Sequence, residues 1–158
     1  SKVREKGYTN TGVAIQARLY RSYNDLIKLI QLRAPVRICK GAYDESKEIA
    51  YTDEGEIRKN FLKLTKFYLQ NHGSVQIATH DDVIIDEIKR FIGGSKQLCN
   101  YEFAMLYSLR MQTMQKLAEE GHFVRYYLPY GSHCIPYLRR RLKERNTRRF
   151  LWKNLLKS

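Results

Sequence analysis

Short apolar runs alternate with longer amphipathic segments along this chain. The apolar runs predict strands over residues 13–17, 36–39, 75–79 and 123–128, with a weaker candidate over 98–103. Apolar residues at helical spacing predict helices over 23–32, 56–71, 81–92 and 111–120, and a last one from Ser132 to about Asn146. The strands read as continuous apolar runs, which is typical of strands covered on both faces.

Local signals for the helix ends accompany this pattern. Ser22 is placed to cap the helix over 23–32. His72-Gly73 follows the longest helix, Gly93-Gly94 follows the next, and Gly121 follows the helix over 111–120. Glycine after a helical run is typical of a helix C-terminus.

A strand followed by a helix, repeated five times, predicts a parallel α/β sheet with helical crossovers. Two architectures remain open, a doubly wound open sheet and a section of a (β/α)8 TIM-like barrel. The chain has no GxGxxG or GxxxxGK[ST] motif, which weakens the nucleotide-binding open sheet. A full barrel takes about 250 residues, so we expect an incomplete barrel. Residues 1–158 are expected to form a single domain, with 146–158 as a basic C-terminal tail.

Polar residues end several of the predicted strands: Gln16, Lys40, Thr79-His80 and Tyr127. In a barrel, the carboxyl ends of the strands meet at the mouth of the active site. This pattern therefore favours a functional site at that end of the sheet. His80 could contact a cofactor there, or could serve only to hold the structure.

Two arginine-containing segments could carry chemistry. Tyr137, Arg140, Arg141 and Glu144 share one face of the last predicted helix, where paired guanidinium groups beside a ring could hold a carboxylate. The alternative is a basic surface helix. Arg37 lies within an apolar run, where burial requires a partner such as an electron-rich cofactor. The alternative is an edge strand whose Arg37 points to solvent.

Composition indicates a globular, basic protein. There are 29 Lys and Arg against 16 Asp and Glu, a net charge of +13, and residues 138–158 hold nine of these cations and only Glu144 as an acid. A solvated tail, nucleic-acid binding and attraction to an anionic membrane are all compatible with such a segment. Cys39, Cys99 and Cys134 form no CxxC pair, which argues against a disulfide framework or zinc site and fits a reducing, intracellular setting. No apolar stretch approaches the roughly 20 residues of a membrane span, and the first ten residues lack a signal-peptide core.

Taken in order, six segments resemble the proline dehydrogenase family, and most closely its short, monofunctional bacterial members. They are VAIQA (13–17), VRICKGAY (36–43), ATHD (78–81), YEF (101–103), YYLPYG (126–131) and YLRRRLKER (137–145). The resemblance implies a distorted (βα)8 barrel that holds FAD at the strand ends. It also implies oxidation of L-proline to Δ1-pyrroline-5-carboxylate by hydride transfer to the flavin, which a membrane quinone reoxidises.

The resemblance also implies roles for individual residues. Arg140 and Arg141 correspond to the pair that holds the proline carboxylate, and Tyr127 and Tyr137 to the aromatic wall around the proline ring. Glu144 corresponds to the acid that supports the last helix near the flavin. Arg37 corresponds to the arginine beside the isoalloxazine ring, and further flavin-contacting positions are Gln16, Cys39, Gly41, Thr79 and His80.

Three features depart from the family pattern. Glu54 and Ile57 stand where a lysine and a threonine usually reach the adenosine or phosphate side of the flavin, and an acid there would repel a pyrophosphate. Ala104 stands where a glutamine usually follows YEF. The first three strand-helix units, which supply a lysine and an aspartate near the substrate, have no counterpart in the sequence.

These observations lead to two hypotheses. The first is a partial proline dehydrogenase barrel that self-associates or requires an N-terminal barrel portion, with L-proline and a quinone as partners and no nucleic acid. We expect a cytoplasmic location with peripheral contact at the inner membrane face. The second is a non-catalytic basic module that binds nucleic acid or anionic lipid. Arg148, Arg149, Lys153 and Lys157 lie beyond the arginine pair and have no role under the first hypothesis.

Overall fold

The computed structural model describes residues 2–43, 45–94, 100–107, 109–128 and 130–131. The chain divides into two units, Ser1–Tyr126 and Tyr127–Ser158, and the architecture below belongs to the first. The predicted last helix and basic tail lie outside the described residues. The expectation that residues 1–158 form a single domain stays a prediction.

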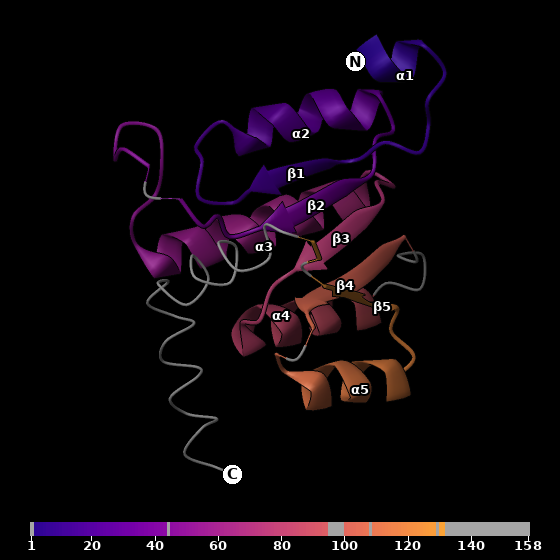
Figure 1. The fold of residues 1–158 in the computed structure, drawn as a ribbon. Helices are drawn as coiled ribbons and strands as arrows, with labels where there is room; N and C mark the ends of the chain where they lie inside the picture. Colours follow the sequence, from indigo (N-terminus) through magenta and orange to yellow (C-terminus); the bar gives the residue numbers. More distant parts are fainter. Residues whose placement is uncertain (1, 44, 95–99, 108, 129, 132–158) are drawn as a thin grey trace. The chain divides into compact units, whose positions relative to one another are not determined.

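Strands and helices alternate along the described chain (Figure 1). They are α1 (Lys2–Glu5), β1 (Val13–Gln16), α2 (Ser22–Gln31), β2 (Val36–Cys39), α3 (Glu54–Gln70), β3 (Val75–Ala78), α4 (Asp82–Gly93), β4 (Tyr101–Leu106), α5 (Met111–Glu119) and β5 (Val124–Tyr127). The predicted strands and the predicted helices before Gly121 are confirmed. The weak strand candidate begins three residues later than predicted, and the short α1 was not predicted.

The sheet follows the order of the sequence, β1-β2-β3-β4-β5. The pairs β1–β2, β2–β3 and β3–β4 are parallel. In a doubly wound sheet the order would reverse at a switch point, whereas sequential parallel strands with right-handed crossovers place their helices on one face. Helices α2, α3 and α4 pack side by side against the sheet. The sheet is therefore of the (β/α)8 barrel type.

Burial alternates along β2 and β3, so the prediction of strands covered on both faces is wrong for these two, whereas Phe103 to Leu106 of β4 are all buried. Val36 and Ile38 of β2, like Val75 and Ile77 of β3, are buried beneath the helices. Arg37 between the first two is exposed. Successive side chains of a strand point to opposite faces. Because the described crossover helices all lie on one face, the alternate positions turn to the other.

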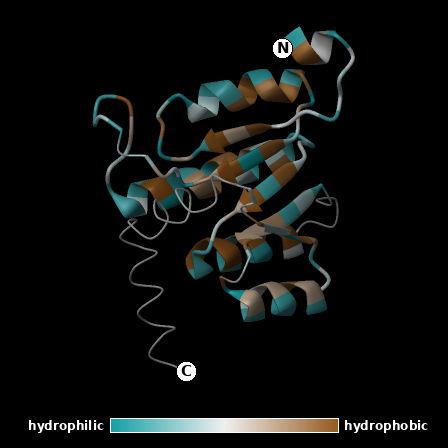
Figure 2. Cartoon of the chain, viewed as in Figure 1, coloured by the Kyte–Doolittle hydropathy of each residue, from teal (hydrophilic) through white to brown (hydrophobic). Residues whose placement is uncertain are grey.

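Helix α3 provides the centre of the apolar core. Its Phe61, Leu64 and Tyr68 are fully buried, and Figure 2 shows apolar and polar positions interleaved along the helices. The Tyr68 hydroxyl donates to the carbonyl of Ala34 at 2.5 Å, which joins the helix to the segment before β2. Gly73 lies against this ring, since a Cβ there would stand 2.1 Å from Tyr68 Cδ1. Gly73 is therefore required by packing.

The helix ends correct two local predictions. Ser22 does not cap α2, because its hydroxyl donates instead to the carbonyl of Gln16 at 2.5 Å. After α3 the left-handed residue is His72 (φ 58°), not Gly73. Asp53 and Asp81 cap α3 and α4 through their side chains. Among the described helices, none is long and apolar enough to cross a membrane.

Candidate functional site

The carboxyl ends of four strands form one row of side chains on the face away from the helices. In the parallel register Gln16 lies beside Cys39, Cys39 beside Ala78, and Ala78 beside Ala104. After Gln16 these side chains are small. Cys39 and Ala78 are half-buried, and Ala104 is buried.

Gln16 and Gly41 are packed against each other at the start of this row. Gly41 has φ 106°, and a Cβ there would stand 2.7 Å from Gln16 Oε1. The backbone is locked beside them, since Ala17 N–H donates to the Cys39 carbonyl at 2.7 Å. Gln16 Oε1 is buried and has no hydrogen-bond partner among the described residues. Such an atom is a candidate acceptor for a ligand N–H, because buried polar atoms are seldom left unpaired.

Thr79 and His80 secure the loop that follows β3. The backbone N–H of Leu106 donates to His80 Nε2 at 3.1 Å, which ties the end of β3 to the end of β4. Thr79 is buried, and its Oγ1 accepts from the N–H of Asp81 at 3.1 Å. Both side chains therefore have a structural role at the position where the family resemblance places a cofactor contact.

A charged cluster joins the ends of β2 and β3 to two helix N-termini. Lys40 Nζ lies 2.7 Å from Asp81 Oδ2 and 2.9 Å from Glu54 Oε2, and Arg58 lies 3.0 Å from Asp81 Oδ2. Asp81 Oδ1 also accepts from Val83 N–H at the start of α4. Burial alone would raise the pKa of Asp81, but the hydrogen bonds and charges of Lys40 and Arg58 outweigh it, so the pKa is lowered.

This cluster changes the picture of the region after β2. Glu54 pairs with Lys40, and Ile57 is buried in the core. Sequence reasoning singled out Lys40 but missed Arg58 and the ionic role of Asp81. Asp81 lies in the ATHD segment and was predicted as the first residue of the helix over 81–92, and its position before an apolar helical run is typical of an N-cap.

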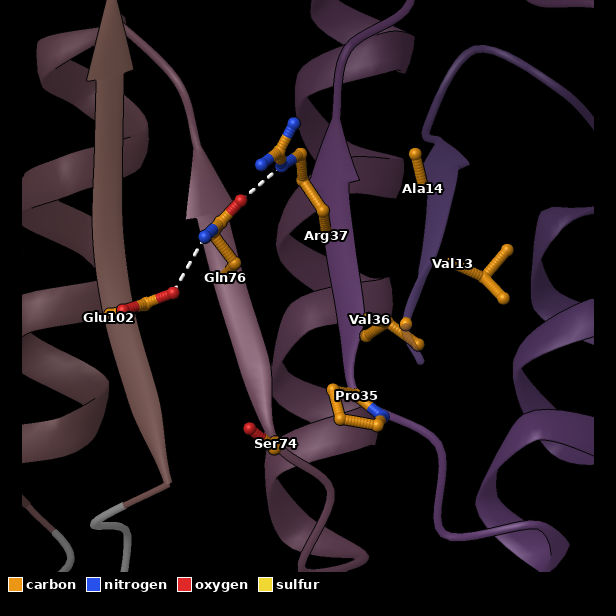
Figure 3. Close-up of a pocket in the computed structure, with 9 residues that line it drawn as sticks. Val13, Ala14, Pro35, Val36, Arg37, Ser74, Gln76 and Glu102 are labelled. Atoms are coloured by element: carbon orange, nitrogen blue, oxygen red, sulfur yellow. Dashed lines mark hydrogen bonds between the residues drawn. The ribbon is translucent and has the colours of Figure 1, made fainter. Parts of the chain in front are cut away.

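Arg37 starts a second polar row, one step before the first on the same face (Figure 3). Its Nε donates to Gln76 Oε1, and Gln76 Nε2 donates to Glu102 Oε1 at 2.6 Å. Arg125, on β5, donates through its Nε to Glu102 Oε1 at 2.7 Å. The alternative was an edge strand whose Arg37 points to solvent: its edge position is wrong, because β2 lies between β1 and β3, but Arg37 is exposed as that alternative expected.

Sequence reasoning missed the other members of this row. Gln76, Glu102 and Arg125 each occupy the second position of a strand, as Arg37 does. This repeated polar position was the available signal, and the interpretation of the strands as continuous apolar runs obscured it.

A hollow of about 430 Å³ opens over the other end of the strands. It is lined by Gly12, Val13, Ala14, Pro35, Val36, Arg37, Ser74, Gln76 and Glu102 (Figure 3). Its lining comes from the first residues of β1 to β4 and from the residues just before them, whereas Gln16 and Cys39 are the last residues of their strands. The hollow is therefore distinct from the row of strand ends, and only Arg37 belongs to both the hollow and the predicted site.

The structure brings together six of the predicted site residues. Gln16, Cys39, Gly41, Thr79 and His80 meet at one end of the sheet, with Arg37 one row earlier. Tyr127 is the last residue of β5 and the first of the second unit. Tyr137, Arg140, Arg141 and Glu144 lie outside the described residues.

Comparisons with known proteins identify the same family in the family models and among the curated relatives. The sequence model of the proline dehydrogenase family matches residues 1–150. Proline dehydrogenase from Deinococcus radiodurans is 40% identical over 145 residues, which cover 90% of this chain and 46% of the relative. Proline dehydrogenase 2 from Bacillus subtilis strain 168 is 39% identical over 142 residues, covering 89% and 46% respectively. The chain thus spans about half the length of the curated relatives it matches.

Solved structures show the same fold. Proline utilization A from Bdellovibrio bacteriovorus, inactivated by N-propargylglycine, superposes with a TM-score of 0.76 at 27% identity. The match covers 89% of this chain and 17% of that one. A variant of proline utilization A from Bradyrhizobium japonicum gives a TM-score of 0.75 at 26% identity, with coverage of 87% and 16%.

Proposed function

Because this chain belongs to the proline dehydrogenase family, we propose that it serves the oxidation of L-proline to Δ1-pyrroline-5-carboxylate. The observation that carries the proposal is the family match over residues 1–150, with relatives 36–40% identical. Since the chain covers about half of those relatives, turnover by this polypeptide alone is part of what an experiment must establish.

The described residues fit a flavin as the cofactor, and we propose FAD. Gln16 Oε1 is a buried acceptor without a described partner, which a ring N–H can satisfy. Cys39, Ala78 and Ala104 place small side chains side by side in the register, and Arg37 supplies a positive charge on the same face. Gly41, Thr79 and His80 shape the same end of the sheet. When bound, FAD accepts the hydride that leaves proline.

Two residues in this region set limits on how the cofactor is held. Glu54 is drawn to Lys40 at 2.9 Å, so part of its charge is neutralised before any phosphate approaches. Ala104 offers no side-chain hydrogen bond to a ring. Binding of the adenosine and phosphate portion therefore relies on other parts of the chain, and we expect FAD affinity to depend strongly on the ring contacts.

The substrate contacts are proposed for the C-terminal segment. Arg140 and Arg141 bind the proline carboxylate through bidentate hydrogen bonds, and Tyr127 and Tyr137 enclose the ring of the substrate. Glu144 holds this segment near the flavin. The chain's contribution is thus to orient proline and to neutralise its carboxylate.

The partners follow from the same proposal. We propose that a membrane quinone reoxidises the flavin, and that the protein is cytoplasmic with peripheral contact at the inner membrane face, where it would meet that quinone. The edge of β1 pairs with a second chain, supplied either by another copy or by an N-terminal barrel portion.

The test is the visible spectrum of the chain purified with added FAD. L-Proline added in the absence of oxygen is expected to bleach the flavin absorption band. A cyclic ether carboxylate analogue of proline is expected to block this bleaching. Arg140→Ala should abolish bleaching while the flavin stays bound. Arg148→Ala removes a guanidinium eight positions later in the sequence that has no assigned role, and this variant should bleach normally.

Other outcomes would contradict the proposal. Failure to take up FAD, combined with DNA or anionic-vesicle binding that is lost at high salt, would favour the basic binding module instead. Flavin uptake with equal bleaching in Arg140→Ala and the unaltered chain would remove the proposed role of the arginine pair.

A further inference from the structure

Arg37 is held by a chain of hydrogen bonds that crosses two neighbouring strands. It passes from Arg37 Nε to Gln76 Oε1, and from Gln76 Nε2 to Glu102 Oε1 at 2.6 Å. The three residues are direct partners in the parallel register. Figure 3 shows the bonded side chains rising from Glu102 through Gln76 to Arg37, toward the arrowheads of the strands.

We propose that Gln76 and Glu102 are positioning residues that aim the Arg37 guanidinium at the cofactor end of the sheet. The inference rests on the proposed function, because it assigns these two residues a part in holding the flavin. The family resemblance assigned no role to either residue, although Glu102 lies in its YEF segment.

The amide of Gln76 has one favourable orientation between its neighbours. Its oxygen accepts from the Arg37 cation and its NH2 group donates to the Glu102 carboxylate. The reversed amide would place N–H against N–H on one side and oxygen against oxygen on the other. Glu102 therefore determines which atom Gln76 presents to Arg37. Such a chain of polar groups acts as a unit, because each bond strengthens the next.

Glu102 remains ionised in this setting. Burial alone would raise the pKa of its carboxyl, but hydrogen bonds from Arg125 and Gln76 and the charges of Arg125 and Arg37 outweigh it, so the pKa is lowered. The negative charge is thus present at neutral pH, and Arg125 Nε donates at 2.7 Å to the same oxygen, Oε1, that accepts from Gln76.

The consequence is an Arg37 side chain with a fixed direction. A flexible arginine loses side-chain entropy when it binds a ligand, whereas one already held by a neighbour loses less. Arg37 lies one row before Cys39 on the face that carries the small residues. The guanidinium is thereby presented to the acceptor-rich ring of a flavin.

The first experiment tests the hydrogen-bonded chain without any cofactor. Nitrogen-15 NMR would follow the exchange of the Arg37 Nε–H proton with solvent. Glu102→Ala and Gln76→Ala are expected to speed this exchange about tenfold, as the loss of one charge-assisted hydrogen bond implies. Glu102→Gln keeps an acceptor and should give a smaller change.

A matched control removes a carboxylate elsewhere. Glu87 pairs with Arg90 at 2.7 Å on α4 and does not belong to the row. Glu87→Ala should leave the Arg37 signal unchanged. Arg37 exchange that is the same in Gln76→Ala, Glu102→Ala and the unaltered chain would overturn the inference.

The second experiment is a double-mutant cycle on FAD affinity, measured by quenching of flavin fluorescence. Arg37→Ala and Glu102→Ala should each weaken binding about tenfold, and the double variant no further than Arg37→Ala alone. If the loss of FAD affinity in the double variant equals the product of the two single losses, Glu102 acts independently of Arg37, and the positioning role is overturned. If the unaltered protein binds no FAD, the proposed function fails together with the cofactor role of Arg37, whereas the exchange measurement still decides the hydrogen-bonded chain.

Discussion

Gly41 is the residue at which backbone and packing requirements coincide. Its φ of 106° is strained for any side chain, and a Cβ would press on Gln16 Oε1 at 2.7 Å. We expect Gly41→Ala to lower the free energy of unfolding by about 1–3 kcal/mol, as measured by urea denaturation. Gln16 must also shift, so FAD affinity should fall together with stability.

Gly121 provides the matched control for this substitution. It also has a positive φ, of 86°, but nothing lies within 4 Å of the Cβ position. Gly121→Ala therefore reports backbone strain without the contact, and should cost less stability and leave FAD binding unchanged. Equal losses of stability from the two substitutions would show that the close contact between position 41 and Gln16 does not contribute to the loss.

Asp81 makes stability depend on pH. Its folded pKa is lowered from the ordinary 3.8 by Lys40 and Arg58, despite burial, so the stabilisation is present above that value and is lost as the pH falls through the lower folded pKa. Asp81→Asn keeps a capping side chain but removes the charge. It should lower the free energy of unfolding at pH 7 by about 1.5–3 kcal/mol and flatten the acid limb of a stability–pH curve.

Asp25→Asn is the comparison for Asp81. Asp25 pairs with Arg21 one helical turn away, and the Arg21 side chain is 74% exposed. Exposed pairs contribute little, so this change should leave unfolding at pH 7 almost unaltered. An acid limb as steep in Asp81→Asn as in the unaltered chain would contradict the assignment.

At the scale of elements, α3 depends on its first turn. Asp53 has an extended backbone, and its carboxylate accepts from Glu56 N–H at 2.9 Å. Asp53→Ala should lower the free energy of unfolding by about 1 kcal/mol, measured by thermal or urea denaturation. Asp53→Asn keeps the acceptor and should recover most of the loss. Similar losses of stability in both variants would show that the charge of Asp53, and not its capping hydrogen bond, stabilises the helix.

At the scale of the whole molecule, β1 ends the described sheet. Val13 N–H donates to the Pro35 carbonyl and Ala17 N–H to the Cys39 carbonyl. Because N–H groups alternate along a strand, that of Ala14 points away from β2, along the open edge. This is the edge through which the proposed self-association would occur.

Ala14→Pro tests that edge. Proline removes the outward donor and spares the pairing with β2, so it should shift the chain toward monomer in light scattering while circular dichroism stays unchanged. Ala14→Ser retains the donor and should associate like the unaltered chain. A folded monomer at every concentration of the unaltered chain would contradict the open-edge argument.

The sequence by itself determined the kinds and order of the elements. Local spacing sufficed for the five described strands and for α2 to α5, because helix and strand periodicity depend on near neighbours. The motifs also identified the residues that meet at the strand ends, including Gln16, Cys39 and His80. The capping role of Ser22 was misread, because its hydroxyl found the Gln16 carbonyl only when α2 packed back onto β1.

Only the tertiary structure decided how those elements present their side chains. Arg37 and Gln76 are 39 positions apart and Lys40 and Asp81 are 41 apart, yet each pair is in contact. Such contacts depend on strand register and on the face that the crossover helices cover, and neither is a local property of the chain. The physical reason is that neighbouring parallel strands are joined by long connections. The partners of a polar side chain are therefore determined by which strands pair and in which register, and not by residues close to it in the sequence.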